Sequence, residues 1–276
     1  MMTSIPTITL NNGVAMPQIG FGVFQVPNDE TQNAVTAALD AGYRSIDTAA
    51  VYGNEEGVGR ALAAAKLPRA ELFITSKVWI SDLGYEATLA AYDASLAKLG
   101  LEYLDLYLIH WPAPATDAYL ESWKALEELL AAGRVRAIGV SNFLPEHLEK
   151  VIALGGTVPA VNQVEIHPAL QQRSITDFDA ANGIATEAWS PLAQGAVLSD
   201  PAVLAIAEAH GKTPAQVVLR WHVEQGRVII PKSVTPARIV ENLNILDFEL
   251  TDADRASIDA LERDGRTGPN PADFNG

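Results

Sequence analysis

Four side chains that can hold or transfer a proton stand at or just after the ends of separate apolar runs. Asp47 ends one run, Tyr52 follows five residues later, and Lys77 and His110 end two others. A lone charge after a buried strand is costly, so we expect Asp47 and Lys77 to pair. A lysine within hydrogen-bond reach lowers the pKa of a phenol, which is otherwise about 10. The four residues predict proton transfer by Tyr52 with His110 as a neutral donor; the alternatives are a structural ion pair and a packed tyrosine.

Eight short apolar runs alternate with helical patterns along the chain. The runs, interpreted as strands, are residues 18–21, 45–47, 72–76, 105–109, 137–140, 160–164, 184–188 and 228–230. The helical patterns, several with proline at the start or glycine at the end, are residues 29–41, 55–65, 85–99, 119–132, 145–154, 201–210, 214–224 and 252–262. Eight such units in 276 residues predict an α/β fold, a single (β/α)8 TIM barrel occupying residues 1–276 as one domain. A β-hairpin that turns at Gly13 precedes the barrel.

The carboxyl ends of the strands share one face in such a barrel, so the residues there should surround one pocket. These residues are Gly22, Asp47, Lys77, His110, Ser141, Asn142, Gln163, Trp189, Ser190, Lys232 and Ser233. After the last strand, Lys232 and Arg238 flank a hydroxyl and the start of a short helix, an arrangement that suits a phosphate.

Composition narrows the class of protein. Hydrophobic residues make up 48% and charged residues 19%, enough apolar side chain for a large core. A net charge of −15 argues against nucleic acid and anionic membranes as partners. The chain has no cysteine, no charged-then-apolar leader and no apolar stretch of membrane-spanning length. We therefore expect a soluble cytoplasmic monomer.

Several rival motifs are incomplete or missing. Gly20 and Gly22 are followed by Gln25 where a dinucleotide-binding fingerprint needs its third glycine. Phe143 replaces the closing glycine of a nucleophile elbow around Ser141, which argues against a serine hydrolase. No phosphate-binding loop of the Walker type is present, and the other histidines have no metal-ligand spacing, so we expect no metal site.

Seven segments resemble motifs of the aldo-keto reductase family, in the family's order and across most of the chain. They are residues 42–55, 77–79, 106–112, 139–143, 162–168, 189–192 and 230–242. The sequence most resembles the short bacterial members related to 2,5-diketo-D-gluconate reductase. The resemblance implies an NADPH-dependent oxidoreductase that reduces aldehydes, ketones or diketones to alcohols, with keto sugar acids such as 2,5-diketo-D-gluconate among the candidate substrates.

The resemblance also implies a role for each proton-carrying residue. Asp47, Tyr52, Lys77 and His110 would form a catalytic tetrad in which Tyr52 protonates the carbonyl oxygen as hydride arrives. Lys77, held by Asp47, would lower the pKa of Tyr52, and His110 would orient and polarise the carbonyl.

Cofactor and substrate contacts are implied in the same way. The cofactor residues would be Gly22, Val23, Asp47, Ser141, Asn142, Gln163, Trp189, Ser190, Pro191, Leu192, Gln194, Lys232, Ser233, Val234, Arg238, Glu241 and Asn242. Among them Ser141, Asn142 and Gln163 would hold the nicotinamide carboxamide, and Trp189 would stack on its ring. Lys232, Ser233 and Arg238 would bind the 2′-phosphate, which favours NADPH over NADH. Substrate would contact Phe24, Tyr52, Trp79, His110 and Trp111, with Phe274 as a further wall.

Two other classes of function stay open at this point. A barrel of this kind could be a catalytically quiet NADPH-binding regulatory or structural subunit, against which the complete tetrad argues. It could also be an isomerase of sugar phosphates, but the sequence shows neither a glycine-rich phosphate loop after the seventh strand nor a clear glutamate base. NADPH turnover with a carbonyl substrate separates these alternatives from a reductase.

Overall fold

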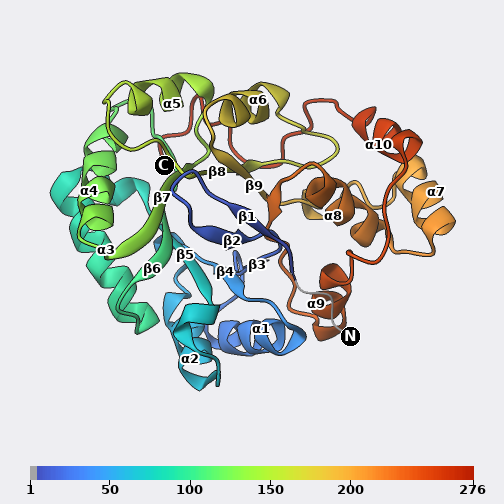
Figure 1. The fold of residues 1–276 in the computed structure, drawn as a ribbon, viewed down its shortest axis with the longest axis horizontal. Coiled ribbons are helices and arrows are strands. Elements are labelled where there is room, and N and C mark those ends of the chain that lie inside the picture. The colour runs from blue at the N-terminus through green and yellow to red at the C-terminus, as the bar shows by residue number, and fades with distance from the viewer. Residues whose placement is uncertain (1–4) are drawn as a thin grey trace.

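A barrel of eight parallel strands occupies the centre of the computed structural model, which describes residues 5–276 (Figure 1). The strands are β3 Phe21–Gly22, β4 Ser45–Asp47, β5 Phe73–Val78, β6 Leu104–Ile109, β7 Val135–Ser141, β8 Val161–Glu165, β9 Ala185–Trp189 and β10 Val228–Ile229. They lie side by side in chain order, and a parallel bridge joins Ile19, two residues before β3, to Ile229 of β10. The predicted barrel is confirmed, with strand ends that differ from the predicted ones by a few residues.

The predicted N-terminal hairpin is also present, and it lies across one end of the barrel (Figure 1). Strands β1 Thr7–Thr9 and β2 Ala15–Pro17 pair antiparallel, and Gly13 has φ +85° at the turn. Leu10 and Met16 pack in one apolar cluster with early strand residues such as Phe73, Leu106 and Val228. The hairpin therefore closes the amino-terminal end of the barrel and leaves the carboxyl end for the site.

Helices surround the strands and bury their apolar sides against them (Figure 1). They are α1 Asn28–Ala41, α2 Glu55–Ala64, α3 Tyr85–Leu99, α4 Tyr119–Ala131, α5 Pro145–Ile152, α6 Arg173–Ala181, α7 Pro201–His210, α8 Pro214–Glu224, α9 Pro236–Leu243 and α10 Asp252–Asp259. Helix α6 was not among the predicted helical patterns. It begins after Gln172, in a left-handed conformation, and has neither an N-terminal proline nor a side-chain cap to mark its start.

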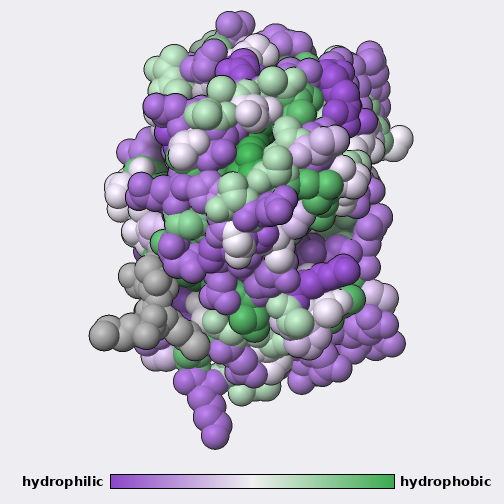
Figure 2. Space-filling view, turned by 90° about the vertical axis from the view of Figure 1, so that its right-hand side faces the viewer, coloured by the Kyte–Doolittle hydropathy of each residue, from purple (hydrophilic) through white to green (hydrophobic). Residues whose placement is uncertain are grey.

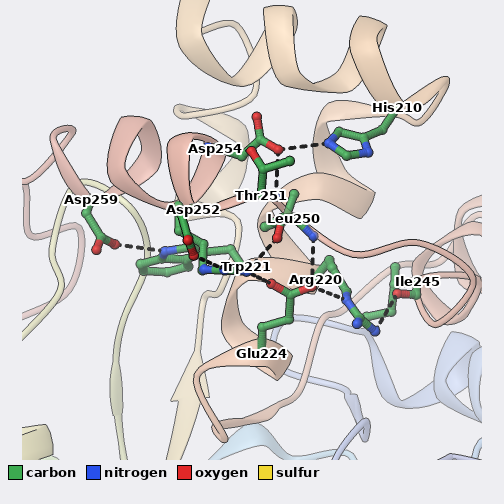
Figure 3. A network of polar contacts seen from close by, with 11 residues as sticks. His210, Arg220, Trp221, Glu224, Ile245, Leu250, Thr251, Asp252, Asp254 and Asp259 are labelled. Atoms are coloured by element: carbon green, nitrogen blue, oxygen red, sulfur yellow. Dashed lines mark hydrogen bonds and ion pairs between the residues drawn. The ribbon is translucent and has the colours of Figure 1, made fainter.

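A network of charged side chains holds α10 against α7 and α8 (Figure 3). Glu224 accepts hydrogen bonds from Arg220 at 2.7 Å, from Arg255 at 2.9 Å and from the Leu250 N–H at 2.9 Å. His210 and Asp254 lie 2.9 Å apart in the same network. The flank of the molecule that carries these helices is mostly hydrophilic, with only scattered apolar patches (Figure 2). None of the helices within residues 5–276 has the length and apolar character needed to traverse a membrane.

Candidate active site

Inward-facing side chains change from apolar to polar toward the carboxyl ends of the strands. On β5 the inward positions carry Phe73 and then Lys77, and on β8 they carry Val161 and then Gln163. Because side chains alternate between the two faces of a strand, residues two apart share the barrel interior. The period of two therefore brings polar groups from separate strands into one buried cluster.

Asp47 and Lys77 form the centre of this cluster. Lys77 Nζ lies 2.6 Å from Asp47 Oδ1, 2.9 Å from the Thr48 carbonyl oxygen and 3.4 Å from the Tyr52 hydroxyl. Both charged side chains are buried, so the ion pair that the sequence predicted is present. All three N–H groups of Lys77 have an acceptor, one of which is the tyrosine hydroxyl.

The pKa values of this cluster follow from burial and charge. Burial raises the pKa of Tyr52 above its ordinary value of 10.0, and Lys77 opposes this by favouring the phenolate. Lys77 thus lowers the pKa of Tyr52 as expected, but burial raises this pKa by more. Burial disfavours the ammonium of Lys77, yet Asp47, together with Tyr52 and Glu187, more than compensates, so the pKa of Lys77 is raised.

Hydrogen bonds of the Asn54 side-chain amide fix the loop that carries Tyr52. Asn54, which is buried, donates through Nδ2 to the carbonyl oxygens of Val23 and Val26 at 2.9 and 3.0 Å. Its Oδ1 accepts from the Thr48 hydroxyl at 2.9 Å. A single buried asparagine thereby joins the Tyr52 loop to the segment after β3.

His110 lies beside Tyr52 with its imidazole in the neutral form. Burial and the nearby Lys77 ammonium hold the pKa of His110 well below 6.5. Its ring centroid lies 5.5 Å from that of Tyr52 and 5.1 Å from that of Trp79. Within residues 5–276, its Nδ1 has no hydrogen-bond partner. A neutral imidazole can donate one hydrogen bond without adding charge.

Aromatic side chains lie around Tyr52 and His110 at the carboxyl end of the barrel. We call Phe24, Trp79, Trp111 and Phe274 the aromatic mouth. Phe24, which is 52% exposed, lies 5.0 Å from Tyr52 between ring centroids. Phe274 lies 4.5 Å from Trp111 and 6.3 Å from Trp79. The structure thus brings the predicted substrate residues together, and Phe274, the further wall that the sequence analysis expected, lies among them.

Asn142, Ser141 and Gln163 are linked to each other by hydrogen bonds. Asn142 Nδ2 donates to the His110 carbonyl oxygen at 3.0 Å and to Ser141 Oγ at 3.1 Å, while Ser141 Oγ donates to the Gln163 carbonyl oxygen at 2.7 Å. Trp189 Nε1 donates to Asn142 Oδ1 at 2.9 Å. The indole is therefore held in place beside the three residues expected to bind a carboxamide.

Two buried carboxyl groups belong to this region, although the sequence analysis did not select them. Glu187 on β9 accepts from Gln163 Nε2 at 2.8 Å, and Glu165 at the end of β8 accepts from the N–H of Thr267 at 2.7 Å and of Gly268 at 3.0 Å. The alternation of strand residues could have found both. Glu187 stands two residues before Trp189, and Glu165 stands two after Gln163.

Glu165 ties the C-terminal segment to the site. Besides Thr267 and Gly268, it approaches His167 Nε2 at 3.1 Å. A Cβ placed on Gly268 would lie 2.5 Å from the Trp189 ring, so only glycine allows this close approach. This attachment carries the chain to the mouth, where Phe274 contacts Trp111.

The loop after β9 contains Ser190, Pro191, Leu192 and Gln194, the residues expected along a pyrophosphate. Ser190 and Gln194 have φ of 46° and 53°, in the left-handed region that residues other than glycine rarely adopt. His222 Nε2 lies 3.1 Å from the Pro191 carbonyl oxygen and supports the loop from α8. Strained backbone of this kind persists where the surrounding structure holds it, often at binding sites.

The residues expected at the far end of the cofactor lie around the start of α9. Lys232, Val234 and Arg238 are exposed, and neither cation enters an ion pair within residues 5–276. Ser233 Oγ accepts from the Thr235 N–H at 3.1 Å. Two unpaired cations on a protein with net charge −15 suit a phosphate group.

The remaining cofactor candidates are more enclosed. Glu241 Oε1 accepts from the Thr213 hydroxyl at 2.7 Å, so part of its carboxylate joins α9 to α8, and Asn242 is buried nearby. Val23 is also buried, and its N–H donates to the Asp47 carbonyl oxygen at 3.1 Å. At Gly22 a Cβ would lie 2.9 Å from the Ile230 carbonyl oxygen, so the backbone itself forms this part of the rim.

Comparison with known proteins agrees with this geometry. The Aldo/keto reductase family model matches residues 18–263. Glyoxal reductase of Bacillus subtilis (strain 168) is 54% identical over 273 residues, covering 98% of each chain. Methylglyoxal reductase DkgA of Escherichia coli (strain K12) is 48% identical over 277 residues, covering 100% of each chain.

A solved structure extends the similarity to three dimensions. A mutant of Gox0644 in complex with NADPH has a TM-score of 0.94 and 49% identity, covering 98% of each chain. Family model, relatives of known activity and solved fold agree over nearly the whole sequence. The chain therefore belongs to the aldo/keto reductase family and is an oxidoreductase.

Proposed function

We propose that this protein reduces small aldehydes, ketones and dicarbonyl compounds to alcohols with NADPH. The observation that carries the proposal is the chain of contacts Asp47, Lys77, Tyr52, with a neutral His110 beside it at an aromatic mouth. In this arrangement Tyr52 can donate a proton, and the buried ammonium of Lys77 can stabilise the phenolate that remains.

NADPH, when bound, supplies the hydride that adds to the carbonyl carbon. Ser141, Asn142 and Gln163 would hold its carboxamide, and Trp189 would support its ring. The loop residues Ser190, Pro191, Leu192 and Gln194 would follow the pyrophosphate, together with the rim at Gly22 and Val23. Lys232, Ser233, Val234, Arg238, Glu241 and Asn242 would hold the adenosine 2′-phosphate end.

The protein's own contribution is the proton. As negative charge builds on the carbonyl oxygen, the Tyr52 hydroxyl gives its proton to that oxygen, and Lys77 stabilises the phenolate that remains. His110 donates a hydrogen bond to the same oxygen and orients it. Asp47 keeps Lys77 charged and in place, as the 2.6 Å contact between them indicates.

The aromatic mouth favours small dicarbonyl compounds as substrates. Phe24, Trp79, Trp111 and Phe274 carry no charge that could pair with a carboxylate. The names of the relatives, glyoxal reductase and methylglyoxal reductase, point to the same substrate class. A keto sugar acid such as 2,5-diketo-D-gluconate would need a cationic partner that these wall residues do not provide.

The test follows NADPH oxidation with methylglyoxal, phenylglyoxal, a simple aldehyde and a keto sugar acid. We expect turnover with the dicarbonyl compounds to exceed turnover with the sugar acid. Tight NADPH binding without turnover of any substrate would instead identify a cofactor-binding subunit. Turnover that is fastest with the sugar acid would overturn the substrate class and leave the reaction standing.

Arg238→Ala tests the cofactor assignment. Loss of this cation should raise the Michaelis constant for NADPH much more than for NADH, because only NADPH carries the 2′-phosphate. Arg263→Ala, which removes an exposed cation outside α9, is the matched control. Equal changes for both cofactors in Arg238→Ala would contradict the assignment.

A further inference from the structure

Glu187 is a buried carboxyl group next to the proposed site. It lies on β9 in direct register with Gln163 of β8, and both side chains are almost fully buried inside the barrel. Gln163 Nε2 donates to Glu187 Oε2 at 2.8 Å and to Asp47 Oδ2 at 2.9 Å. A continuous chain of contacts thus runs from Glu187 through Gln163, Asp47 and Lys77 to Tyr52.

These contacts determine which way the Gln163 amide faces. A glutamine side chain has two N–H groups and one acceptor oxygen, and here both N–H groups are directed to carboxyl oxygens. A reversed amide would place Oε1 against Asp47, whose carboxylate oxygens only accept, so that two acceptors would face each other. The oxygen of Gln163 is therefore the atom left for a ligand.

We propose that Glu187 is a positioning residue, which acts through Gln163 on Asp47 and on the nicotinamide carboxamide. The proposal rests on the proposed function, since it requires NADPH to bind beside Gln163. With its orientation fixed in this way, Gln163 presents an acceptor to the amine of the carboxamide. Without Glu187, one buried N–H of Gln163 loses its partner and the amide can shift or rotate.

The charge state of Glu187 agrees with this role. Burial, with a further contribution from Asp47, raises the pKa of Glu187 to about 8. The carboxyl group is then mostly neutral at neutral pH and accepts from Gln163 without adding a second negative charge beside Lys77. The charged or titratable groups that act on it are Asp47 on β4, Lys77 on β5 and Tyr52 after β4.

The test uses three variants of the full-length protein and two cofactors. Glu187→Met removes the acceptor at similar length, and Glu187→Gln retains an acceptor oxygen. Asp179→Leu is the matched control, because Asp179 is a buried carboxyl that accepts from Asn162 and Thr186 outside this chain of contacts. The cofactors are NADPH and its 3-acetylpyridine analogue, in which a methyl group replaces the amine of the carboxamide.

Dissociation constants, measured by quenching of tryptophan fluorescence, and melting temperatures are the readouts. We expect Glu187→Met to weaken NADPH binding roughly tenfold but to change binding of the acetylpyridine analogue much less. Glu187→Gln should return the NADPH constant to within about threefold of wild type. Asp179→Leu should lower the melting temperature and leave both dissociation constants unchanged.

A purely structural role for Glu187 predicts a different pattern. Glu187→Met would then lower the melting temperature as Asp179→Leu does, with both dissociation constants unchanged, and the proposal would be wrong. Threonine suits a strand but is too short to reach Gln163, so Glu187→Thr must give the same result as Glu187→Met. If Glu187→Met does not fold, Glu187→Thr replaces it in the test. Failure of the wild type to bind NADPH would refute the proposed function itself.

Discussion

Two charged networks in this protein differ in the balance of their charges. Inside the barrel, the one ammonium, Lys77, pairs with Asp47 and acts on the second carboxyl group, Glu187, only through its charge. At the outer edge, the carboxyl group of Glu224 pairs with Arg220 (Figure 3) and with Arg255, and Arg255 also pairs with Asp252.

The difference in balance appears in the pKa values. Burial works against the charge of Glu224, but the Leu250 N–H and both arginines outweigh it and hold the pKa of Glu224 below 4.5. Glu187 has no cation of its own, and its pKa is raised to about 8. Two cations on one carboxyl group fix its charge state and suit a structural role, whereas a carboxyl group without a cation of its own can gain or lose a proton near neutral pH.

Removal of the inner cation should have the largest effect. Lys77→Met leaves the buried Asp47 without its cation and Tyr52 without the group that stabilises its phenolate. We expect kcat/KM for methylglyoxal to fall on the order of 10³-fold, with a loss of about 3–5 kcal/mol in the free energy of unfolding. Steady-state kinetics and urea unfolding measure the two effects. A variant that keeps kcat/KM within tenfold of wild type would show that Lys77 serves stability alone.

The pH dependence of stability should separate the inner carboxyl from the outer one. Glu187 has a folded pKa of about 8 against an ordinary value of 4.5, so the folded protein binds the extra proton between these values. Its contribution to stability therefore falls as pH rises through this window, by up to about 1.4 kcal/mol per pH unit. Glu187→Gln should lack this decline when urea unfolding is compared with wild type from pH 5 to pH 8. Parallel curves for the two proteins would contradict the raised pKa.

The outer network should give a smaller effect with the opposite sign. Glu224 has a lowered pKa, so the stability it contributes is present above about 4.5 and is lost as pH falls through its folded value. Glu224→Gln should cost about 1–2 kcal/mol at pH 7, with NADPH turnover unchanged. Acid unfolding and steady-state kinetics check both parts. A variant that loses turnover in proportion would couple the outer network to the site.

Local patterns in the sequence predicted most of the fold and the pairing of Asp47 with Lys77 near Tyr52 and His110. The apolar runs that end in Asp47, Lys77 and His110 indicated the buried strands and also the polar residues at their carboxyl ends. Helix α6 was missed because its start lacks the proline or capping side chain that marks other helices. The helix forms because its apolar side packs on the strands between which it lies, β8 and β9. This packing depends on the whole fold and not on the local sequence.

The site was predicted less completely where tertiary contacts decide the chemistry. The sequence analysis selected Gln163 and Trp189 near the ends of β8 and β9, and it did not select Glu165 and Glu187 in the same strands. The raised pKa of Tyr52 depends on burial, which no local spacing reveals. The attachment of Thr267 to Glu165 joins residues 102 positions apart and could not be read from either segment alone.

The account depends most on Tyr52 as the proton donor to a carbonyl oxygen, and a single-turnover experiment tests this directly. Wild type, Tyr52→Phe and Tyr107→Phe are each loaded with NADPH and mixed with methylglyoxal; Tyr107 is a buried tyrosine on the helix side of β6 and serves as the control. We predict equal NADPH binding in all three and a loss on the order of 10³-fold in the oxidation rate of Tyr52→Phe alone. Oxidation by Tyr52→Phe at a rate close to that of wild type would contradict the account.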